Sequence, residues 1–287
     1  VAQAQQWPSG TLLVACHSAM GFSRLQPSAL PSLLRLLCLC RFALPQAEAA
    51  KAKPHEVDRQ MVRDCMASRG GRVEVGDHAP QYRPLGTVVP FDFALGEGER
   101  SMVLGLEECV RGTGRHIEDR VFEYSTGGNN VTYLNEFLQT ELPDVTARIR
   151  DIAQGAVEAA GYTLAISRLG IRCIELLRYE SANGFSEVGF HEDSESNYTM
   201  VLMLSELGRD YTGGAFEINN EDDGSTTLEQ VELGHGFLFD SEKSHRVHTV
   251  SSGIRTVLVL EFWDLADTSS RMFRPGRKYG KPMKLDL

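Results

Sequence analysis

His191 and Asp193 are separated by a single residue, which is a spacing that suits a metal site. On a strand edge, side chains at positions i and i+2 point to the same side, so an imidazole and a carboxylate can reach one ion. The triplet alone is weak, because eight His and 39 acidic residues supply about one such triplet by chance. A second one, His116-Ile117-Glu118, has no supporting context, and we expect it to lie on a solvated helix face.

The residues further along the chain strengthen the first triplet. His245 lies 54 positions after His191, and Arg255 follows ten positions later. Two His and one carboxylate on one face of a ferrous ion leave three positions open, two for a chelating 2-oxo acid and one for O₂. The far carboxylate of such an acid suits an arginine, whose planar fork makes bidentate hydrogen bonds. The four residues together predict an Fe(II) site with a 2-oxo acid as co-substrate.

His248 competes with His245 for the role of third ligand. On an extended strand two residues three apart face opposite sides, so one cannot replace the other without a change of register. The spacing to Arg255 favours His245, and we expect His248 to be a surface imidazole or a neighbour of the ligands. His235 lies between Gly234 and Gly236 and is expected in a turn.

The elements that must position these residues follow from periodicity. Helical spacing predicts helices over 54–66, 100–112 and 143–160, the last with Pro143 in its first turn and Gly161 at its end. After Gly161 the pattern changes to short β-rich runs separated by turn clusters. These runs cover 171–179, 198–204, 214–218, 236–240, 247–250 and 256–262. Strands with no helices between them indicate a sandwich or barrel, so we expect an α+β protein with helices first and then a jelly-roll core.

Four parts of the chain are expected on this basis. Residues 1–50 form a leader, targeting or disordered segment, and 51–160 form the helical N-terminal part of the catalytic domain. Residues 161–265 form the jelly-roll core, and 266–287 form a basic tail. From 20 to 49 the chain is apolar, contains Arg and has no acid before Glu48, which is typical of a secretory or organellar targeting peptide. The sequence does not decide between these compartments.

Three segments resemble the prolyl and lysyl hydroxylase group of 2-oxoglutarate dioxygenases, over residues 171–263. LLRYESANGFSEVGFHED is similar to the strand that enters the family's His-x-Asp turn, and YTMVLMLSELGRDYTGGAFEI is similar to its next strand and Gly-Gly hairpin. HRVHTVSSGIR matches the family pattern His-x-Val-x-x-Val-x-x-Gly-x-Arg almost throughout. The resemblance implies a double-stranded β-helix that uses Fe(II), 2-oxoglutarate and O₂, frequently with ascorbate as reductant.

The resemblance also implies roles for individual residues. His191, Asp193 and His245 bind iron, and Arg255 binds 2-oxoglutarate with help from Tyr179. A plain core aromatic is the alternative for Tyr179. Thr199 is a further candidate for the co-substrate pocket, because it alternates with Val201 and Met203 on the expected barrel interior. The implied reaction is hydroxylation of a C–H bond, with a peptidyl proline or lysine as the expected substrate and succinate as the co-product.

The sequence departs from parts of the wider superfamily. Collagen-type prolyl hydroxylases usually carry Lys at the Arg255 position, whereas lysyl hydroxylases carry Arg. Related halogenases replace the carboxylate with a small residue, and this chain keeps Asp193. Nucleic-acid demethylases add a second Arg six residues after the first, where this chain has Glu261. The residues before 160 match no family segment, and the substrate is therefore left open.

Composition and charge disfavour several other classes of protein. The net charge is −10, and residues 1–47 carry three Arg and no acid, so the remainder stands at −13. Such a body suits neither DNA nor RNA, which bind through clustered Lys and Arg. No apolar stretch reaches the roughly 18 residues of a membrane span. The six cysteines form no C-x-x-C pair, so we expect ordinary thiols. The oligomeric state cannot be predicted.

Two rival functions stay open at this stage. One is a non-catalytic jelly-roll module that keeps the outline of the site and binds a peptide or a sugar. The other is a cupin-like enzyme with a different metal, for which three His ligands are usual. The set of two His and one carboxylate favours the iron enzyme over both.

Overall fold

The computed structural model describes residues 54–70, 76, 79–86, 88–121, 127–193, 196–220, 224–228 and 231–264. The expected leader at 1–50 and the expected basic tail at 266–287 lie outside the described residues. Helices come first along the described chain, followed by a long run of strands. The helices are α1 (Pro54–Ser68), α2 (Glu97–Gly112), α3 (Phe137–Glu141) and α4 (Pro143–Ala160), with a short 3₁₀ turn, η1 (Ile166–Arg168).

The larger of two antiparallel sheets is the central layer of the fold. In spatial order its strands are β1 (Val88–Phe91), β10 (Gly236–Asp240), β6 (Tyr198–Met203), β12 (Val250–Asp264), β4 (Leu169–Glu180), β3 (Gly128–Tyr133) and β2 (Ile117–Val121). A short strand, β7 (Tyr211–Gly213), pairs with the beginning of β12. The smaller sheet has the order β5 (Val188–His191), β11 (His245–Val247), β8 (Phe216–Asn220) and β9 (Gly224–Leu228).

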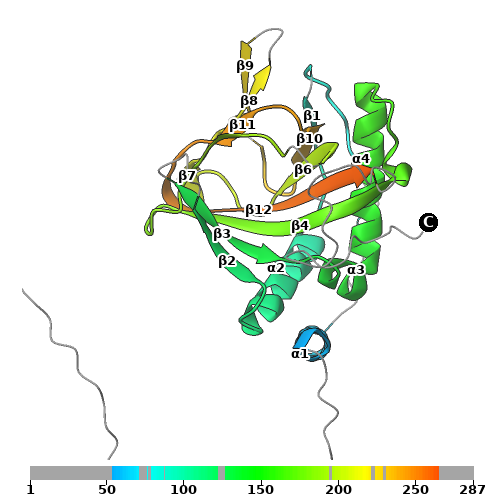
Figure 1. Cartoon of the computed structure of the whole chain (residues 1–287), viewed down its shortest axis with the longest axis vertical. Coiled ribbons are helices and arrows are strands. Elements are labelled where there is room, and N and C mark those ends of the chain that lie inside the picture. The colour runs from blue at the N-terminus through cyan, green and yellow to red at the C-terminus, as the bar shows by residue number, and fades with distance from the viewer. Residues whose placement is uncertain are drawn as a thin grey trace, which may run out of the picture. The chain divides into compact units, whose positions relative to one another are not determined.

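From β4 onward the chain alternates between the two sheets. β4, β6, β10 and β12 lie in the larger sheet, and β5, the β8–β9 hairpin and β11 lie in the smaller one. This alternation is the double-stranded β-helix, so the expected α+β fold with a jelly-roll core is confirmed. Figure 1 shows β8, β9 and β11 of the smaller sheet above β12 and β4, and α2 and α3 below them.

Apolar residues on both faces of the larger sheet explain its position between two cores. Along β12, Leu258, Leu260 and Phe262 pack with the helices, while Val257 and Val259 face the smaller sheet. Successive side chains of a strand point to opposite faces, so an almost continuous apolar run is buried on both sides. The sequence pattern of β12 and β4 therefore requires cover on each face, which the helices and the smaller sheet provide.

Helix α4 shows how the local sequence sets an element's ends. Pro143 occupies the first turn, where its missing N–H is not needed. Gly161 ends the helix in the left-handed conformation, with φ of 71°, and its N–H donates to Val157 and Glu158 carbonyls. Val145 and Ile149 lie on the buried face against the larger sheet. The expected helices at 54–66, 100–112 and 143–160 are all confirmed. The first extends to Ser68, the second begins at Glu97, and the third has the expected ends.

Several strand boundaries differ from expectation. β12 begins at Val250 rather than at 256 and ends at Asp264, β4 covers Leu169–Glu180 rather than 171–179, and β6 ends at Met203. The run expected over 247–250 is split, because β11 ends at Val247 and β12 begins at Val250. The run expected over 214–218 is shifted, because β8 starts at Phe216. In addition, the stretch 51–160 contributes β1, β2 and β3 to the larger sheet besides its helices.

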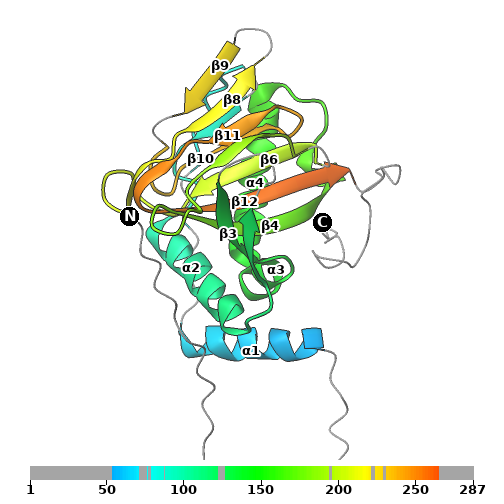
Figure 2. The ribbon, with the colours of Figure 1, turned by 60° about the vertical axis from the view of Figure 1, so that its left-hand side comes forward.

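Two cysteines expected to be ordinary thiols are instead paired. Cys65 in α1 and Cys109 in α2 form a disulfide, with Cα atoms 5.7 Å apart. Figure 2 shows α1 crossing below α2, which brings these residues together. They lie 44 residues apart in sequence, so their proximity depends on the packing of the two helices. Sequence spacing alone could not reveal it.

His116 also differs from expectation. The triplet that contains it was expected on a helix face, but Ile117 starts β2. The His116 ring lies edge-on to Phe137 at 4.9 Å, and its Nε2 is 3.1 Å from an Asp58 carboxylate oxygen.

Among the helices described, none has both the length and the apolar character needed to cross a membrane.

Candidate metal and co-substrate site

His191 and His245 are brought together by the smaller sheet. His191 ends β5 and His245 starts β11, and the two are direct partners in the antiparallel register. Asp193 follows β5 by two residues, and its backbone N–H donates to the Ser241 carbonyl at 2.9 Å. Asp193 Oδ1 is 3.9 Å from His191 Nε2, and Asp193 Oδ2 is 3.6 Å from His245 Nε2. The three expected metal ligands therefore converge on one point.

Both imidazoles are oriented by their other ring nitrogen. His191 Nδ1 lies 2.9 Å from the Gly189 carbonyl oxygen, and His245 Nδ1 lies 2.9 Å from that of Lys243. A carbonyl can only accept, so the proton is on Nδ1 and the Nε2 lone pair faces Asp193. Burial, together with His191, lowers the pKa of His245 to about 3. A neutral imidazole with its lone pair turned inward is the form that binds a metal ion.

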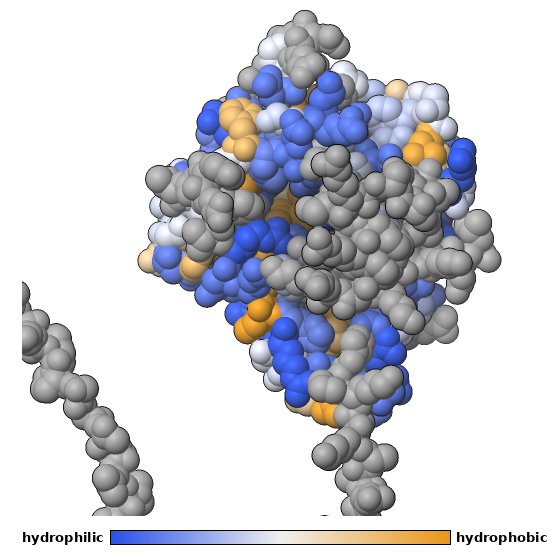
Figure 3. Space-filling model, viewed as in Figure 1, coloured by the Kyte–Doolittle hydropathy of each residue, from blue (hydrophilic) through white to orange (hydrophobic). Residues whose placement is uncertain are grey.

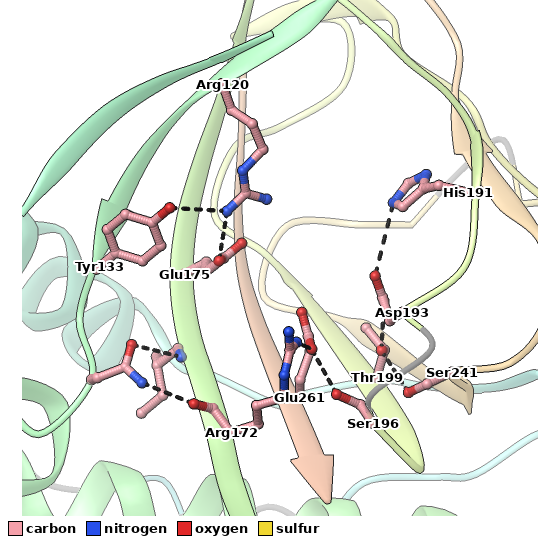
Figure 4. A network of polar contacts seen from close by, with 12 residues as sticks. Arg120, Tyr133, Arg172, Glu175, His191, Asp193, Ser196, Thr199, Ser241 and Glu261 are labelled. Carbon is pink, nitrogen blue, oxygen red and sulfur yellow. Dashed lines mark hydrogen bonds and ion pairs between the residues drawn. The ribbon is translucent and has the colours of Figure 1, made fainter. Parts of the chain in front are cut away.

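The carboxylate is held in turn by two hydroxyl groups. Thr199 Oγ1 donates to Asp193 Oδ2 at 2.7 Å, and the Ser241 hydroxyl is 2.9 Å from Thr199 Oγ1. Figure 4 shows these residues in line beneath His191. Burial raises the pKa of Asp193, and the His191 and Thr199 contacts oppose that rise. Thr199, expected to bind the co-substrate, thus lines the pocket and also fixes the orientation of Asp193.

His248 lies outside this cluster. It is half-exposed, and its Nε2 is 2.6 Å from a carboxylate oxygen of Glu217. Arg246 donates to the same carboxylate. The structure thus places His245 on the pocket side and His248 with the surface pair, as the spacing to Arg255 indicated.

One pocket between the two sheets joins the His–Asp–His cluster to Arg255. His191, Asp193, His245, Thr199, Tyr179 and Arg255 all line it. The rings of Phe216 and Phe239 form an apolar wall against His245, with centroids at 5.6 and 4.7 Å from the imidazole. Figure 3 shows apolar residues in a recess beside hydrophilic residues near the centre of this view.

Arg255 is buried at this site and has no acidic partner in the part of the chain that the structure describes. The residue is 3% exposed, and no described residue forms a hydrogen bond with its Nε. Its described neighbours are the Tyr179 ring, with the centroid 5.4 Å from Cζ, the Tyr211 hydroxyl and the Met203 sulfur at 3.9 Å from Nη2. Within the described residues, no carboxylate forms an ion pair with it. A buried guanidinium normally has an anionic partner, so this position is suited to a ligand's carboxylate.

Known proteins were compared with this chain by sequence and by structure. No protein-family model matches the sequence, and no curated protein matches it. Among solved structures, the chain is similar to an oxidoreductase of the 2OG-Fe(II) oxygenase family from Burkholderia pseudomallei. They share 17% identity over 62% of this chain and 86% of that one, with a TM-score of 0.48. The chain is similar in structure to 2-oxoglutarate and iron(II) oxygenases.

Two further structures show the range of activities among these neighbours. An α-ketoglutarate-dependent epimerase from nogalamycin biosynthesis shares 14% identity over 70% of this chain and 92% of its own, with a TM-score of 0.49. A prolyl hydroxylase from Trichoplax adhaerens, in complex with a hypoxia inducible factor peptide fragment, shares 10% over 73% and 92%, with a TM-score of 0.47. At these values the likeness concerns the fold, and the function has to be argued from the site.

Two buried carboxylates in the pocket were not singled out as site residues. Glu175 on β4 accepts from Arg120 Nη2 at 2.6 Å. Glu261 on β12 pairs with Arg172 and accepts from the Ser196 hydroxyl at 2.6 Å. Burial raises the pKa of both carboxylates, while the arginine beside each one opposes the rise. These pairs extend the polar lining of the pocket beyond the expected residues.

Cys173 lies with these two carboxylates in a fully buried group whose potential ligand atoms are close together. Each carboxylate already has an arginine partner, so a cation there would have to displace a guanidinium. Burial also raises the pKa of the Cys173 thiol, which keeps it protonated. The His191, Asp193 and His245 group offers two imidazole nitrogens beside a carboxylate, so it is the better metal site.

A signal for the missed carboxylates was present in the sequence. Glu175 and Glu261 interrupt apolar strand runs, and a charge in such a run needs a partner. Arg120 had no comparable signal, since the segment around it shows no clear period. Its position follows only from the pairing of β2 with β3 and of β3 with β4.

Proposed function

We propose that this protein is an Fe(II)- and 2-oxoglutarate-dependent oxygenase that hydroxylates a C–H bond. The observation that carries the proposal is Arg255, a buried guanidinium with no acidic partner among the described residues, which lines the same pocket as the His–Asp–His cluster. A metal cluster alone is compatible with many proteins. Together with a cation placed for a carboxylate, it is suited to a chelating 2-oxo acid.

The donor set fits Fe(II). His191 and His245 offer neutral nitrogens and Asp193 offers a carboxylate oxygen, a set that leaves further metal positions open for other ligands. When bound, Fe(II) activates O₂, and oxidative decarboxylation of 2-oxoglutarate to succinate and CO₂ supplies the oxidising power for hydroxylation. Thr199 keeps Asp193 turned toward the two imidazoles.

Arg255 would hold the far carboxylate of 2-oxoglutarate. Nε is free for a second hydrogen bond beside the Nη atoms, which permits bidentate binding. Tyr179 lies against the guanidinium, and burial raises the pKa of its hydroxyl, so it remains a neutral donor. Phe216 and Phe239 form an apolar wall beside His245, which limits the access of water.

The substrate and reductant remain predictions from the resemblance of the sequence motifs. A peptidyl proline or lysine is the expected substrate class, and ascorbate is the expected reductant. Neither follows from the metal ligands or Arg255, because these residues serve the chemistry that all such oxygenases share.

The test is turnover of 2-oxoglutarate by the purified chain with Fe(II) under air. Succinate should form slowly without a substrate and faster with a suitable one. If the folded protein binds iron but never forms succinate, with or without candidate peptides, the enzyme proposal is wrong. That result would favour the rival reading as a non-catalytic binding module.

The second rival, a cupin-like enzyme with another metal, differs in its ligands. Such proteins usually offer three His, whereas this cluster has two His and Asp193. Metal analysis after anaerobic purification separates the two, because iron at one equivalent supports the oxygenase.

A further inference from the structure

The β2–β3 hairpin places two polar side chains in the pocket from outside the jelly-roll. Arg120 on β2 and Asn129 on β3 are direct partners in the antiparallel register and both line the pocket. Opposite residues on such a pair have Cβ atoms about 5 Å apart, so the two act as neighbours on one wall. Neither residue is needed to bind the metal ion or the far carboxylate of 2-oxoglutarate.

Hydrogen bonds fix one terminal nitrogen of the Arg120 guanidinium and leave the other nitrogens available. Its Nη2 donates to Glu175 at 2.6 Å and to the Tyr133 hydroxyl at 3.3 Å, and that hydroxyl donates to Glu118 at 2.6 Å. In the described part of the chain, the side-chain hydrogen bonds of Arg120 are all made by Nη2, and the side chain is 25% exposed. Figure 4 shows its guanidinium on one side of the cavity and His191 on the other. Arg120 therefore offers N–H donors in a fixed position, and the carboxylate of Glu175 balances its charge.

Asn129 offers a hydrogen-bond acceptor, whereas Arg120 offers donors. It is 1% exposed, and its hydrogen bond to Tyr179 lowers the pKa of that hydroxyl, as a bond donated to the phenolic oxygen does. Its Nδ2 is thus used, and Oδ1 is buried without a partner in the described residues. An orphan buried acceptor requires an N–H or O–H donor. 2-Oxoglutarate carries only acceptors when ionised, so it cannot satisfy Asn129.

We propose that Arg120 and Asn129 form the subsite for the second substrate, and that this substrate carries a secondary amide. Arg120 donates to the amide oxygen and Asn129 Oδ1 accepts from the amide N–H. A carboxylate is a poorer match, because it has no donor for Asn129 and Glu175 already neutralises Arg120. This inference rests on the proposed function and narrows its substrate class. The amide can belong to a peptide backbone or to a small acylated molecule.

The experiment uses the full chain with Fe(II) and 2-oxoglutarate and three matched probe sets. These are N-methylamides of simple carboxylic acids, the corresponding methyl esters and the free acids, none of which carries another amide, with blocked tripeptides as a fourth arm. The readout is succinate formed above the rate without a probe. The methylamides should stimulate turnover at concentrations about tenfold lower than the esters or acids, since one buried hydrogen bond is worth about that factor. Tripeptides that greatly outperform the methylamides identify a peptide as the source of the amide.

Two variants test whether Asn129 binds the N–H of the amide and whether Arg120 binds its oxygen. Asn129→Leu removes the acceptor, so the preference for amide over ester should disappear. Arg120→Lys keeps a cation beside Glu175 but loses the second arm of the guanidinium. The KM for the amide probe should then rise about tenfold more than the KM for 2-oxoglutarate.

Matched controls separate binding from structure. Arg178→Lys changes an arginine on β4 that pairs with the buried Glu107 outside the pocket, and it should leave the KM for the probe unchanged. Tyr179→Phe removes the hydroxyl that Asn129 binds but keeps Oδ1, and it should retain the preference for amide over ester.

The inference is overturned if acids or esters match the amides, if Asn129→Leu keeps the amide preference, or if no amide stimulates a protein that does turn over 2-oxoglutarate. A protein that neither binds nor consumes 2-oxoglutarate would overturn the proposed function first, and this inference with it. The rate without a probe distinguishes the two failures.

Discussion

Arg255 and Tyr179 face each other across the antiparallel pair of β12 and β4, with the guanidinium over the phenol ring. Within the described chain, this is the buried cation of the pocket that lacks a carboxylate. The first prediction concerns Arg255→Gln. The KM for 2-oxoglutarate should rise at least about tenfold, because a charge-assisted hydrogen bond is worth roughly 1.5–3 kcal/mol. Steady-state succinate formation measures this.

The same variant should not lose stability without 2-oxoglutarate. A buried charge with no partner is unfavourable, so a neutral side chain of similar size is tolerated or stabilising. Thermal unfolding of the two proteins without added ligand provides the comparison. A large drop in Tm for Arg255→Gln, with 2-oxoglutarate affinity retained, would show that Arg255 has a structural role instead.

The metal ligands give the second prediction. Asp193→Ala should abolish stoichiometric Fe(II) binding, weakening affinity by more than about a hundredfold, since even changes next to metal ligands often cost about 10–100-fold. Anaerobic titration with Fe(II) measures it. His248→Ala is the matched control, because His248 pairs with Glu217 away from the cluster. Retained iron binding in Asp193→Ala, or its loss in His248→Ala, would contradict the assignment.

Thr199→Val tests how far Asp193 depends on its hydrogen bond. The change keeps the shape of the side chain but removes the donor 2.7 Å from Asp193 Oδ2. We expect Fe(II) affinity to fall about tenfold with the fold intact. If 2-oxoglutarate affinity falls instead while Fe(II) affinity is unchanged, Thr199 is the co-substrate residue that its place on the barrel interior first indicated.

The disulfide gives a prediction about stability. Replacing Cys65 and Cys109 with Ser should lower the free energy of unfolding by about 4 kcal/mol, from the entropy of opening a loop of this length. Urea unfolding with and without reductant measures it. Reductant should destabilise the natural chain and leave the double variant unaffected. Equal sensitivity of both proteins to reductant would show that another thiol is responsible.

The sequence was sufficient to predict the elements whose signals are local. Helix α4 has its proline and glycine at its two ends, and β12 and β4 are long apolar runs. The grouping of the candidate ligands with Arg255 could also be expected, since His191 and His245 lie on the paired strands β5 and β11 and Arg255 lies on β12, the next strand along the chain. These predictions depended on short-range pattern and on order along the chain.

The remaining features depend on long-range packing. Arg120 reaches Glu175 across 55 residues of sequence, and Cys65 reaches Cys109 through the crossing of two helices. Strand β2 is polar and short, and it gains its place by pairing with β3 rather than by its own periodicity. The subsite of Arg120 and Asn129 therefore became visible only when the larger sheet was assembled.

The position of β5 at the edge of the smaller sheet links metal binding to local motion. This four-residue strand pairs only with β11 among the described strands, and it carries His191. An ion bound by both His191 and His245 would cross-link β5 to the neighbouring strand β11. Amide hydrogens of β5 should then exchange much more slowly in the metal-loaded protein than in the metal-free one, while those of β4 and β12 change little. Bound iron would thus stabilise the pairing of β5 with β11, so the ion would have a structural effect on the strand that carries one of its ligands.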